Sequence, residues 1–187
     1  PLIFVNRRDP GGGAASLYVG IDNVAAGQAV ADHCLSRGFR SIGLIHGPLF
    51  SSATADRVTG FLAMLESAGR PLPSDCVITP SVSDHLAIGH AGAKRLAAQG
   101  TPLHALVCTS DLMAFGAHRA FAERGLPMPH FIGFDDSPMN EWVAPWLTSV
   151  RIPYERYGEA IVSLLARPAE AGPALASIQP FRLVIRG

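Results

Sequence analysis

The sequence predicts an α/β protein built on doubly wound parallel sheets. Short apolar runs rich in Val, Ile and Leu alternate along the chain with longer amphipathic segments, which is the pattern of repeated β–α units. Apolar residues make up 48% of the chain and charged residues 16%, and the mean hydropathy is +0.24, as expected for strands buried on both faces. The length of 187 residues allows one well-packed core or two small lobes that share their strands.

Seven of the apolar runs have the length and composition of buried strands, and most of them end at Gly, Pro, Ser or Asp. In chain order, we expect strands at Leu2–Val5, Ser41–His46, Cys76–Thr79, Ala105–Thr109, Phe131–Phe134, Thr148–Ile152 and Phe181–Ile185.

Five longer amphipathic segments are expected to be helices. Asp22 and Asn23 are suitable caps before the first of them, and a glycine that could adopt a left-handed conformation follows each of the first four. The expected helices are Val24–Arg37, Ala55–Ala68, Asp84–Gln99, Asp111–Arg124 and Tyr154–Ala166. The Pro- and Ala-rich stretch Ala166–Ser177 is expected to be a linker before the last strand.

Charge and cysteine content exclude several classes of protein. Fifteen basic side chains balance fifteen acidic ones and the pI is about 7.5, so the chain lacks the basic character of a domain that grips nucleic acid by itself. Cys34, Cys76 and Cys108 form no pair with metal or redox spacing, and we expect buried free thiols in a reducing cytoplasm.

No apolar run approaches the roughly 18 residues that span a membrane. The chain begins at Pro1 rather than Met, so we expect its natural start to lie elsewhere.

Polar side chains follow four of the expected strands. They are Asn6-Arg7-Arg8, the loop Gly47–Ser52 with Arg57 just beyond it, Ser110-Asp111, and Asp135-Asp136. Because ligands of parallel α/β sheets bind outside the carboxyl ends of the strands, these groups should converge on one crevice. Guanidinium and carboxylate groups that each bridge neighbouring hydroxyls suit a polyhydroxylated ligand.

Each of these groups also has a structural interpretation. Arg57 could be a solvated helix arginine, and Asp111 could cap its helix rather than touch a ligand. Asp135-Asp136 could be a turn pair or half of an oxygen-ligand metal site, although no other acidic cluster has matching spacing. We therefore expect no metal and no cofactor.

Motifs of catalysis are missing from the sequence. It has no GxSxG elbow, Walker A loop, GxGxxG after a strand or HExxH. His33, His90 and His118 fall within expected helices and His46 ends a strand, so we interpret all four as structural or surface residues. Strand-end polar groups without an activated nucleophile favour a binding protein over an enzyme.

The order and spacing of seven local patterns resemble the LacI/GalR family of bacterial repressors over essentially the whole chain. The patterns are Asp22-Asn23 before a helix, HCLSRGFRSIGLIHGP at 33–48, RVTGF at 57–61, SDLMAFGAHRAFAERGLPMP at 110–129, GFDDSP at 133–138, PWLTSVRIPYERYG at 145–158 and FRLVIRG at 181–187.

The resemblance implies a two-lobed fold like that of periplasmic sugar-binding proteins, with the effector between the lobes. Residues 1–21 and 151–175 would form a partial N-terminal lobe, and residues 22–150 and 176–187 the C-terminal lobe. In this family the first half of the N-terminal lobe and the DNA-binding headpiece come earlier in the chain. The resemblance therefore implies a fragment from which the headpiece is absent.

The resemblance also assigns effector-binding roles to individual residues. Arg57 matches the arginine that grips sugar hydroxyls or a carboxylate, and Asp135 the aspartate that accepts from ligand donors. Ser110 stands at a position often held by Asn, and Asn6 at an amide or acidic position that selects the distal group of the ligand. Ser51 falls in the loop before the arginine. Tyr154 falls where family members place an aromatic wall.

Two departures from the family pattern affect this site. Ser81–His85 replaces the usual aromatic platform, so a sugar would lose a stacking partner there. Within that segment, Asp84 either contacts the effector or caps its helix. The connection from Gly125 to Phe131 is about three residues shorter than usual, which could displace Asp135.

The function implied is effector sensing in a cytoplasmic LacI-type transcriptional regulator. A small metabolite, a sugar or sugar derivative, would bind in the interlobe cleft and control operator binding allosterically. The partners implied are this effector, operator DNA through the missing headpiece and a second copy of the chain in a homodimer, with no membrane. The alternatives are a periplasmic sugar-binding protein of a transporter, and an enzyme such as a sugar or nucleotide hydrolase.

Overall fold

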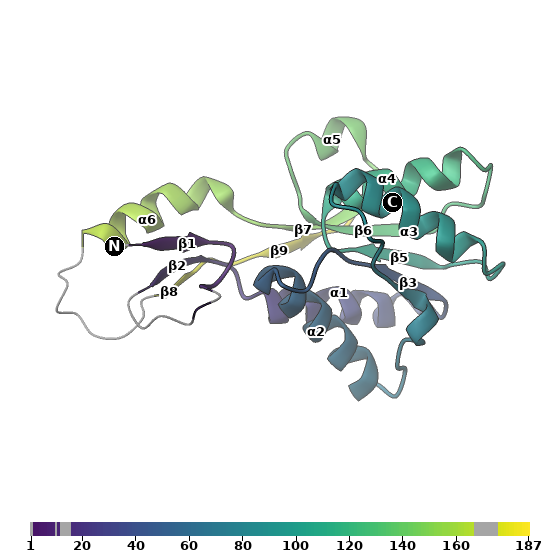
Figure 1. Ribbon diagram of the computed structural model, residues 1–187, viewed down its shortest axis with the longest axis horizontal. Coiled ribbons are helices and arrows are strands. Elements are labelled where there is room, and N and C mark those ends of the chain that lie inside the picture. The colour runs from purple at the N-terminus through teal and green to yellow at the C-terminus, as the bar shows by residue number, and fades with distance from the viewer. Residues whose placement is uncertain (1, 10, 12–15, 167–175) are drawn as a thin grey trace.

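The computed structural model describes residues 2–9, 11, 16–166 and 176–187, and it places them in two lobes, each built on its own sheet (Figure 1). The larger sheet has the strand order β4-β3-β5-β6-β7-β9 and the smaller has the order β1-β2-β8. The strands of the larger sheet are β3 (Ile42–Ile45), β4 (Val77–Ile78), β5 (Ala105–Cys108), β6 (His130–Asp135), β7 (Leu147–Arg151) and β9 (Arg182–Val184). Those of the smaller sheet are β1 (Ile3–Val5), β2 (Leu17–Gly20) and β8 (Ala176–Ile178).

Both faces of the larger sheet are covered by helices. The helices α1 (Asn23–Ser36) and α2 (Ser52–Ser67) pack on one face, and α3 (His85–Ala97) and α4 (Asp111–Ala122) pack on the other (Figure 1). Along β5, Val107 belongs to the apolar core under α1 and α2, whereas Leu106 and Cys108 belong to the core under α3 and α4. The neighbouring strands β3 and β5 are therefore apolar and buried at every position, and the predicted α/β fold class is confirmed.

Glycines allow the two helices on each face to approach closely. A Cβ on Gly60 of α2 would lie 2.1 Å from the carbonyl oxygen of Val24 in α1. On the other face, a Cβ on Gly89 of α3 would lie 1.8 Å from the carbonyl oxygen of Met113 in α4. Because these neighbours are backbone atoms, they cannot move aside without shifting a helix.

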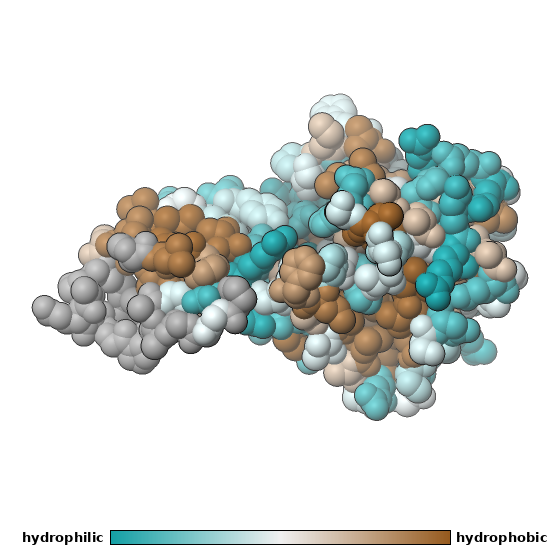
Figure 2. Space-filling model, in the orientation of Figure 1, coloured by the Kyte–Doolittle hydropathy of each residue, from teal (hydrophilic) through white to brown (hydrophobic). Residues whose placement is uncertain are grey.

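The smaller lobe consists of the three-stranded sheet and α6 (Tyr157–Leu165), which follows a 3₁₀ turn at Tyr154–Arg156. The described chain passes between the lobes after β2, after β7 and after β8. β7 and β9 pair in antiparallel fashion at this junction, and every other strand pair is parallel among the described residues. Apolar side chains gather over α6, including the exposed Val162 and Leu165 (Figure 2).

Two strands were not predicted from the sequence. β2 is Leu17–Gly20, and β8 is Ala176–Ile178, which begins inside the Pro- and Ala-rich stretch that we expected to be a linker. The expected linker Ala166–Ser177 overlaps the first two residues of β8, and its residues 167–175 lie outside the described residues. Because β8 pairs with β2, residues 176–178 belong to the smaller sheet. We had expected the C-terminal lobe to resume at residue 176, and the structure places that boundary after β8 instead.

The remaining elements differ from expectation mainly at their ends. The second helix begins at Ser52 instead of Ala55, and the last begins at Tyr157 because the 3₁₀ turn precedes it. Short helical segments at Ser74–Cys76 and Asn140–Val143 (α5) were not predicted. Asp22 caps α1 as expected, accepting a hydrogen bond from the backbone N–H of Ala25 at 2.9 Å.

All three cysteines are free, but only two are buried. Burial raises the pKa of the Cys34 thiol to about 12 and raises that of Cys108 further still, so neither is a thiolate at neutral pH. Cys76 is partly exposed, contrary to our expectation, because it lies in the turn before β4. Among the described residues, no helix has both the length and the apolar character needed to cross a membrane.

We predict opposite effects for alanine at two helical glycines. Gly89→Ala should lower the free energy of unfolding by about 1–3 kcal/mol, because its Cβ would clash with the backbone of Met113. Gly158→Ala in α6 meets no atom within 4 Å and should raise it by about 0.5 kcal/mol, because alanine favours the helix. Urea denaturation followed by circular dichroism measures both changes. Equal stability of the two variants would contradict the close packing of α3 on α4.

Candidate functional site

A cavity of about 290 Å³ lies between the two lobes, at the carboxyl ends of β1, β3, β5 and β6. This is the place where parallel α/β sheets bind ligands. Its lining residues are Asn6, Arg7, Pro48, Phe50, Ser51, Ala53, Thr54, Arg57, Ser83, His85, Thr109, Ser110, Met113, Asp135 and Tyr154.

Arg57 forms the floor of the cavity and is only 6% exposed, so it is not a solvated helix arginine. Its Nε donates to Oδ1 of Asn23 at 2.8 Å, and its Nη1 donates to the carbonyl oxygen of Thr109 at 2.8 Å. The guanidinium carbon lies 4.7 Å from the centre of the Phe134 ring, a cation–π contact. These contacts fix the guanidinium, and among the described residues Nη2 is left without a hydrogen-bond partner.

Burial lowers the pKa of Arg57, and the nearby carboxylate of Asp135 opposes this change. An arginine remains charged even so, because its ordinary pKa lies far above neutral pH. The cavity therefore holds a desolvated cation whose free N–H groups favour an acceptor on a ligand.

Asp135, the last residue of β6, also lines the cavity. Its Oδ1 accepts a hydrogen bond from the Tyr154 hydroxyl at 3.0 Å. Burial raises the pKa of Asp135, whereas Arg57 and the hydrogen bond from Tyr154 lower it. The shorter connection before β6 has not moved this carboxylate out of the cavity.

Asp136 does not line the cavity, and its carboxylate forms ion pairs with two arginines. Its carboxylate pairs with Arg186 at 2.6 Å and, more loosely, with Arg151 at 3.9 Å. Asp135 and Asp136 both have positive φ, at 117° and 48°, so the backbone turns sharply between the two side chains. The pair is therefore not half of a metal site. The described part of the chain contains no group of three or more His, Cys, Asp or Glu that could hold a metal ion.

Asp111 neither caps α4 nor contacts the cavity, so both sequence interpretations of this residue were wrong. The cap is Ser110, whose hydroxyl oxygen accepts from the backbone N–H of Met113 at 3.3 Å. Asp111 is 4% exposed and accepts three hydrogen bonds, from the backbone N–H of Asp136 at 2.8 Å, Nδ2 of Asn140 at 2.7 Å and the Ser149 hydroxyl at 2.7 Å. It thereby holds the turn that carries Asp135.

Asn6 and Tyr154 link the smaller lobe to the cavity. Nδ2 of Asn6 donates to the Tyr154 hydroxyl at 3.0 Å, and the Tyr157 hydroxyl donates to Oδ1 of Asn6 at 2.8 Å. Asn6 has a φ of 59°, a left-handed conformation that asparagine tolerates better than most residues. A hydrogen-bonded chain thus runs from the end of β1 through Tyr154 to Asp135.

The remaining predicted residues are two serines and Asp84. Ser51 lines the cavity at the cap position of α2, with no capping hydrogen bond from its side chain. Ser110 lines the cavity and shares a hydrogen bond of 3.0 Å with Nδ1 of His85. Asp84 is absent from the lining and caps α3, accepting from the backbone N–H of Ala87 at 2.8 Å. The capping interpretation of Asp84 is therefore the one that the geometry favours.

Two ring-bearing side chains line the cavity without having been predicted as binding residues, although the loop Gly47–Ser52 that contains one of them was expected there. His85 lies in the segment interpreted as lacking an aromatic platform, yet its imidazole lines the cavity. Phe50 also lines it and is 87% exposed, so its ring stands at the mouth. His85 directly follows a capping aspartate and precedes a buried helix face. This position is the signal in the sequence that could have indicated His85 as a cavity residue.

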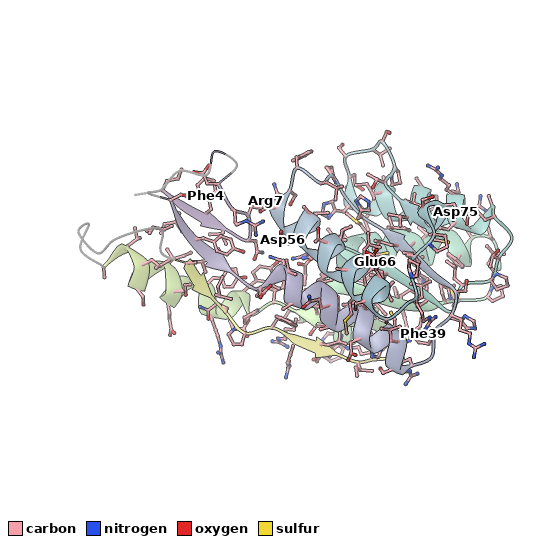
Figure 3. The ribbon with its side chains drawn as sticks, turned by 90° about the horizontal axis from the view of Figure 1, so that it is seen from below. Phe4, Arg7, Phe39, Asp56, Glu66 and Asp75 are labelled. Carbon is pink, nitrogen blue, oxygen red and sulfur yellow. The ribbon has the colours of Figure 1, made fainter. Side chains whose placement is uncertain are left out.

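The lobes are also tied together beside the cavity. Arg8, after β1, forms a two-point ion pair with Asp56 of α2, in which Nη2 donates to Oδ1 at 2.8 Å. Its backbone N–H donates to the hydroxyl oxygen of Ser52 at 2.8 Å. The labelled Arg7 and Asp56 mark this junction between the lobes (Figure 3). The contacts bring the end of β1 against the start of α2.

Comparison with known proteins agrees with this architecture. A profile of the periplasmic binding protein-like domain family matches residues 31–187. The chain is 34% identical over 178 residues to the HTH-type transcriptional regulator MalR of Streptomyces coelicolor, which covers 91% of this chain and 51% of that protein. The chain spans about half the length of the curated relatives it matches.

Two solved structures are similar over the full chain. A regulatory protein of the LacI family from Chloroflexus aggregans has a TM-score of 0.82 at 27% identity, with 100% of this chain and 67% of that chain covered. The transcriptional regulator CelR, solved as a complex with cellobiose, has a TM-score of 0.87 at 26% identity, with 100% of this chain and 58% of that chain covered.

We predict that Asp111 makes stability depend on pH. Burial raises the pKa of this carboxyl to about 7, partly opposed by the hydrogen bonds from Ser149 and Asn140. The folded state therefore binds more protons than the unfolded state between about pH 4 and pH 7, and this contribution to stability is lost as the pH rises through that range. Asp111→Asn should remove this dependence and lower the free energy of unfolding by about 1–3 kcal/mol, because its amide N–H₂ faces other donors.

Urea denaturation at pH 5 and pH 8 measures the effect. The deficit of Asp111→Asn relative to wild type should be larger at pH 5 than at pH 8. The exposed Asp32 of α1 offers a matched control, and Asp32→Asn should behave like wild type at both values. A deficit of Asp111→Asn that does not change with pH would exclude titration of this group.

Proposed function

Because this chain belongs to the LacI family of transcriptional regulators, through its periplasmic binding protein-like domain, we propose that it senses a small-molecule effector between its lobes. The observation that carries this proposal is the interlobe cavity in which Arg57 and Asp135 face Asn6 and Tyr154. Two opposite charges and several hydroxyl and amide groups form one polar surface there. No reacting group has to be invoked, so the proposal is binding rather than turnover.

We further propose a sugar or sugar derivative as the effector. Arg57 offers N–H donors, Asp135 offers carboxylate acceptors, and the serines and Asn6 offer both, which suits a ligand with many hydroxyl groups. The volume of about 290 Å³ lies at the lower end of the range for ligand pockets, roughly 300–1,000 Å³, and favours a small metabolite. Phe50 supplies an aromatic face at the mouth. The cellobiose complex of CelR supports the same ligand class by similarity.

The effector would act by joining the two lobes. Its contacts with Arg57 and Asp135 lie on the larger lobe, and those with Asn6 on the smaller, so binding favours one relative orientation of the lobes. In the whole regulator we propose that this change reaches a DNA-reading helix-turn-helix domain and alters operator binding in the cytoplasm. A coupling free energy of about 1–3 kcal/mol would change operator affinity roughly 5- to 150-fold.

An exposed apolar surface supports a homodimer. Met139, Trp142 and Val143 around α5 are more than half exposed, and Leu112 of α4 is nearly half exposed. The hydrogen bond from Asn140 to Asp111 brings the starts of α5 and α4 together, and we refer to these four exposed side chains as the α4–α5 patch. We propose that a second copy of the chain covers this α4–α5 patch, because contiguous apolar patches mark interaction sites.

The effector proposal predicts a selective loss of binding at Asp135. A thermal-shift screen of the purified chain with cellobiose, other sugars, sugar phosphates and purines should identify a stabilising ligand. Asp135→Asn should then weaken binding of that ligand about 10- to 100-fold in calorimetry, because it removes a charge-assisted hydrogen bond. Asparagine tolerates the positive φ of this position, so the fold should persist.

Asp84→Asn is the matched control, because it makes the same chemical change outside the cavity and preserves the cap. Its affinity should equal that of wild type. Equal affinity of Asp135→Asn and wild type would remove Asp135 from the binding site. Binding lost in Asp84→Asn and retained in Asp135→Asn would place the ligand against Asp84 instead of Asp135.

The dimer proposal predicts a monomer on substitution of Trp142. Wild type should sediment as a dimer, and Trp142→Glu as a folded monomer, because a charge cannot be buried in the apolar contact. Val162→Glu is the control, since Val162 is also more than half exposed to solvent but lies on α6. Sedimentation velocity measures both. Dissociation by Val162→Glu alone would move the interface to the smaller lobe.

A further inference from the structure

A second cavity, of about 400 Å³, lies where the chain crosses between the lobes. It is lined by Arg151, Pro153, Glu155, Arg156, Pro180, Phe181 and Arg182. Tyr154 of the same crossover lines the interlobe cavity, whereas its neighbours Pro153 and Glu155 line this one. The two cavities thus share a wall but no lining residue.

The cavity concentrates positive charge. Three arginines and one glutamate line it, which leaves an excess of two positive charges. Arg151 of β7 and Arg182 of β9 are direct partners across the antiparallel strand pair. Like charges directly opposite each other destabilise a sheet, so an anion bound between them would stabilise this pairing.

Few carboxylates among the described residues neutralise the positive charge of these arginines. Arg151 reaches Asp136 only at 3.9 Å, and that carboxylate already pairs with Arg186 at 2.6 Å. Arg156 and Arg182 are exposed and have no ion pair within the described part of the chain. The α-helix that begins immediately after Arg156 adds the partial positive charge of its N-terminus nearby.

We propose that this crossover cavity binds a phosphate group. The planar guanidinium groups of arginine match phosphate oxygens in two-point hydrogen bonds. Pro153, Pro180 and Phe181 provide an apolar surface beside the arginines, which suits the organic part of a phosphorylated metabolite as well as free phosphate. The bound anion would lie between Arg151 and Arg182 and relieve their repulsion.

Binding there would stiffen the connection between the lobes. β7 leads from the larger lobe toward α6, and β9 receives the chain from β8 of the smaller lobe. Arg151 also faces Asp136, which adjoins Asp135 of the interlobe cavity. A phosphate could therefore act as a second effector on lobe orientation. This consequence rests on the proposed function, whereas the binding of phosphate itself does not.

Thermal shift and calorimetry with three probes test the proposal on the purified chain. The probes are inorganic phosphate, glucose 6-phosphate and glucose, each at an ionic strength held constant with sodium chloride. We expect inorganic phosphate to raise the Tm of wild type, and Arg182→Gln to weaken phosphate binding at least 10-fold. Without phosphate, Arg182→Gln should unfold at the same or a higher temperature than wild type, because one of two opposed charges is gone.

Arg119→Gln is the matched control, since Arg119 is an exposed arginine of α4 that does not line the crossover cavity. It should bind phosphate as wild type does. No shift beyond that of chloride, or equal losses in both variants, would overturn the proposal.

The glucose 6-phosphate arm distinguishes the two cavities. Tighter binding than inorganic phosphate, lost in Arg182→Gln and retained in Asp135→Asn, would identify a phosphorylated metabolite as the occupant of the crossover cavity. Binding lost in Asp135→Asn and retained in Arg182→Gln would place the sugar phosphate in the interlobe cavity. That result would contradict a phosphorylated metabolite as the ligand of the crossover cavity. Phosphate binding without any sugar binding would support this site while contradicting the proposed function, so the two failures are distinguishable.

Discussion

The Asp111 carboxylate organises the edge of the larger sheet at which both cavities meet. Its three hydrogen-bond donors come from the turn after β6, from α5 and from β7. A buried carboxylate is costly unless its oxygens are satisfied, so the three donors must assemble around it together. That requirement fixes a turn in which two consecutive aspartates have positive φ. The turn sends Asp135 into the interlobe cavity and Asp136 toward Arg186.

Charge separation at this edge gives the two cavities different chemistry. Arg57 and Asp135 set a cation and a carboxylate on the walls of the interlobe cavity, which suits a neutral ligand with both donors and acceptors. The crossover cavity has three arginines and a single glutamate, which suits an anion. The segment 151–156 separates the two, so an occupant of either cavity touches the chain that connects the lobes.

Most residues of the candidate site could be predicted because ligands bind at the carboxyl ends of parallel strands. Asn6, Ser51, Arg57, Ser110 and Asp135 lie at or soon after strand ends, and parallel strands bring those ends to one edge, so all of them line the cavity. Asp84 does not line the cavity, and its side chain instead accepts a hydrogen bond from the backbone N–H of Ala87 at the start of α3. Asp111 could not be assigned from sequence, because its donors are 25 to 38 residues away. His85 reaches the cavity from the first position of α3 and Phe50 from the loop after β3, and no local pattern specifies where the fold places either ring.

The sequence by itself determined the alternation of strands and helices, the apolar strands of a sheet covered on both faces, and the strand-end polar groups. Those features depend on neighbouring residues and on periodicity. Only the tertiary structure decided that β8 joins the smaller sheet, that Asp111 is a buried anchor, and that Arg151 stands opposite Arg182. The reason is that strand pairing, desolvation and charge repulsion act between residues distant in the chain, and their outcome depends on which side chains the packed fold brings together.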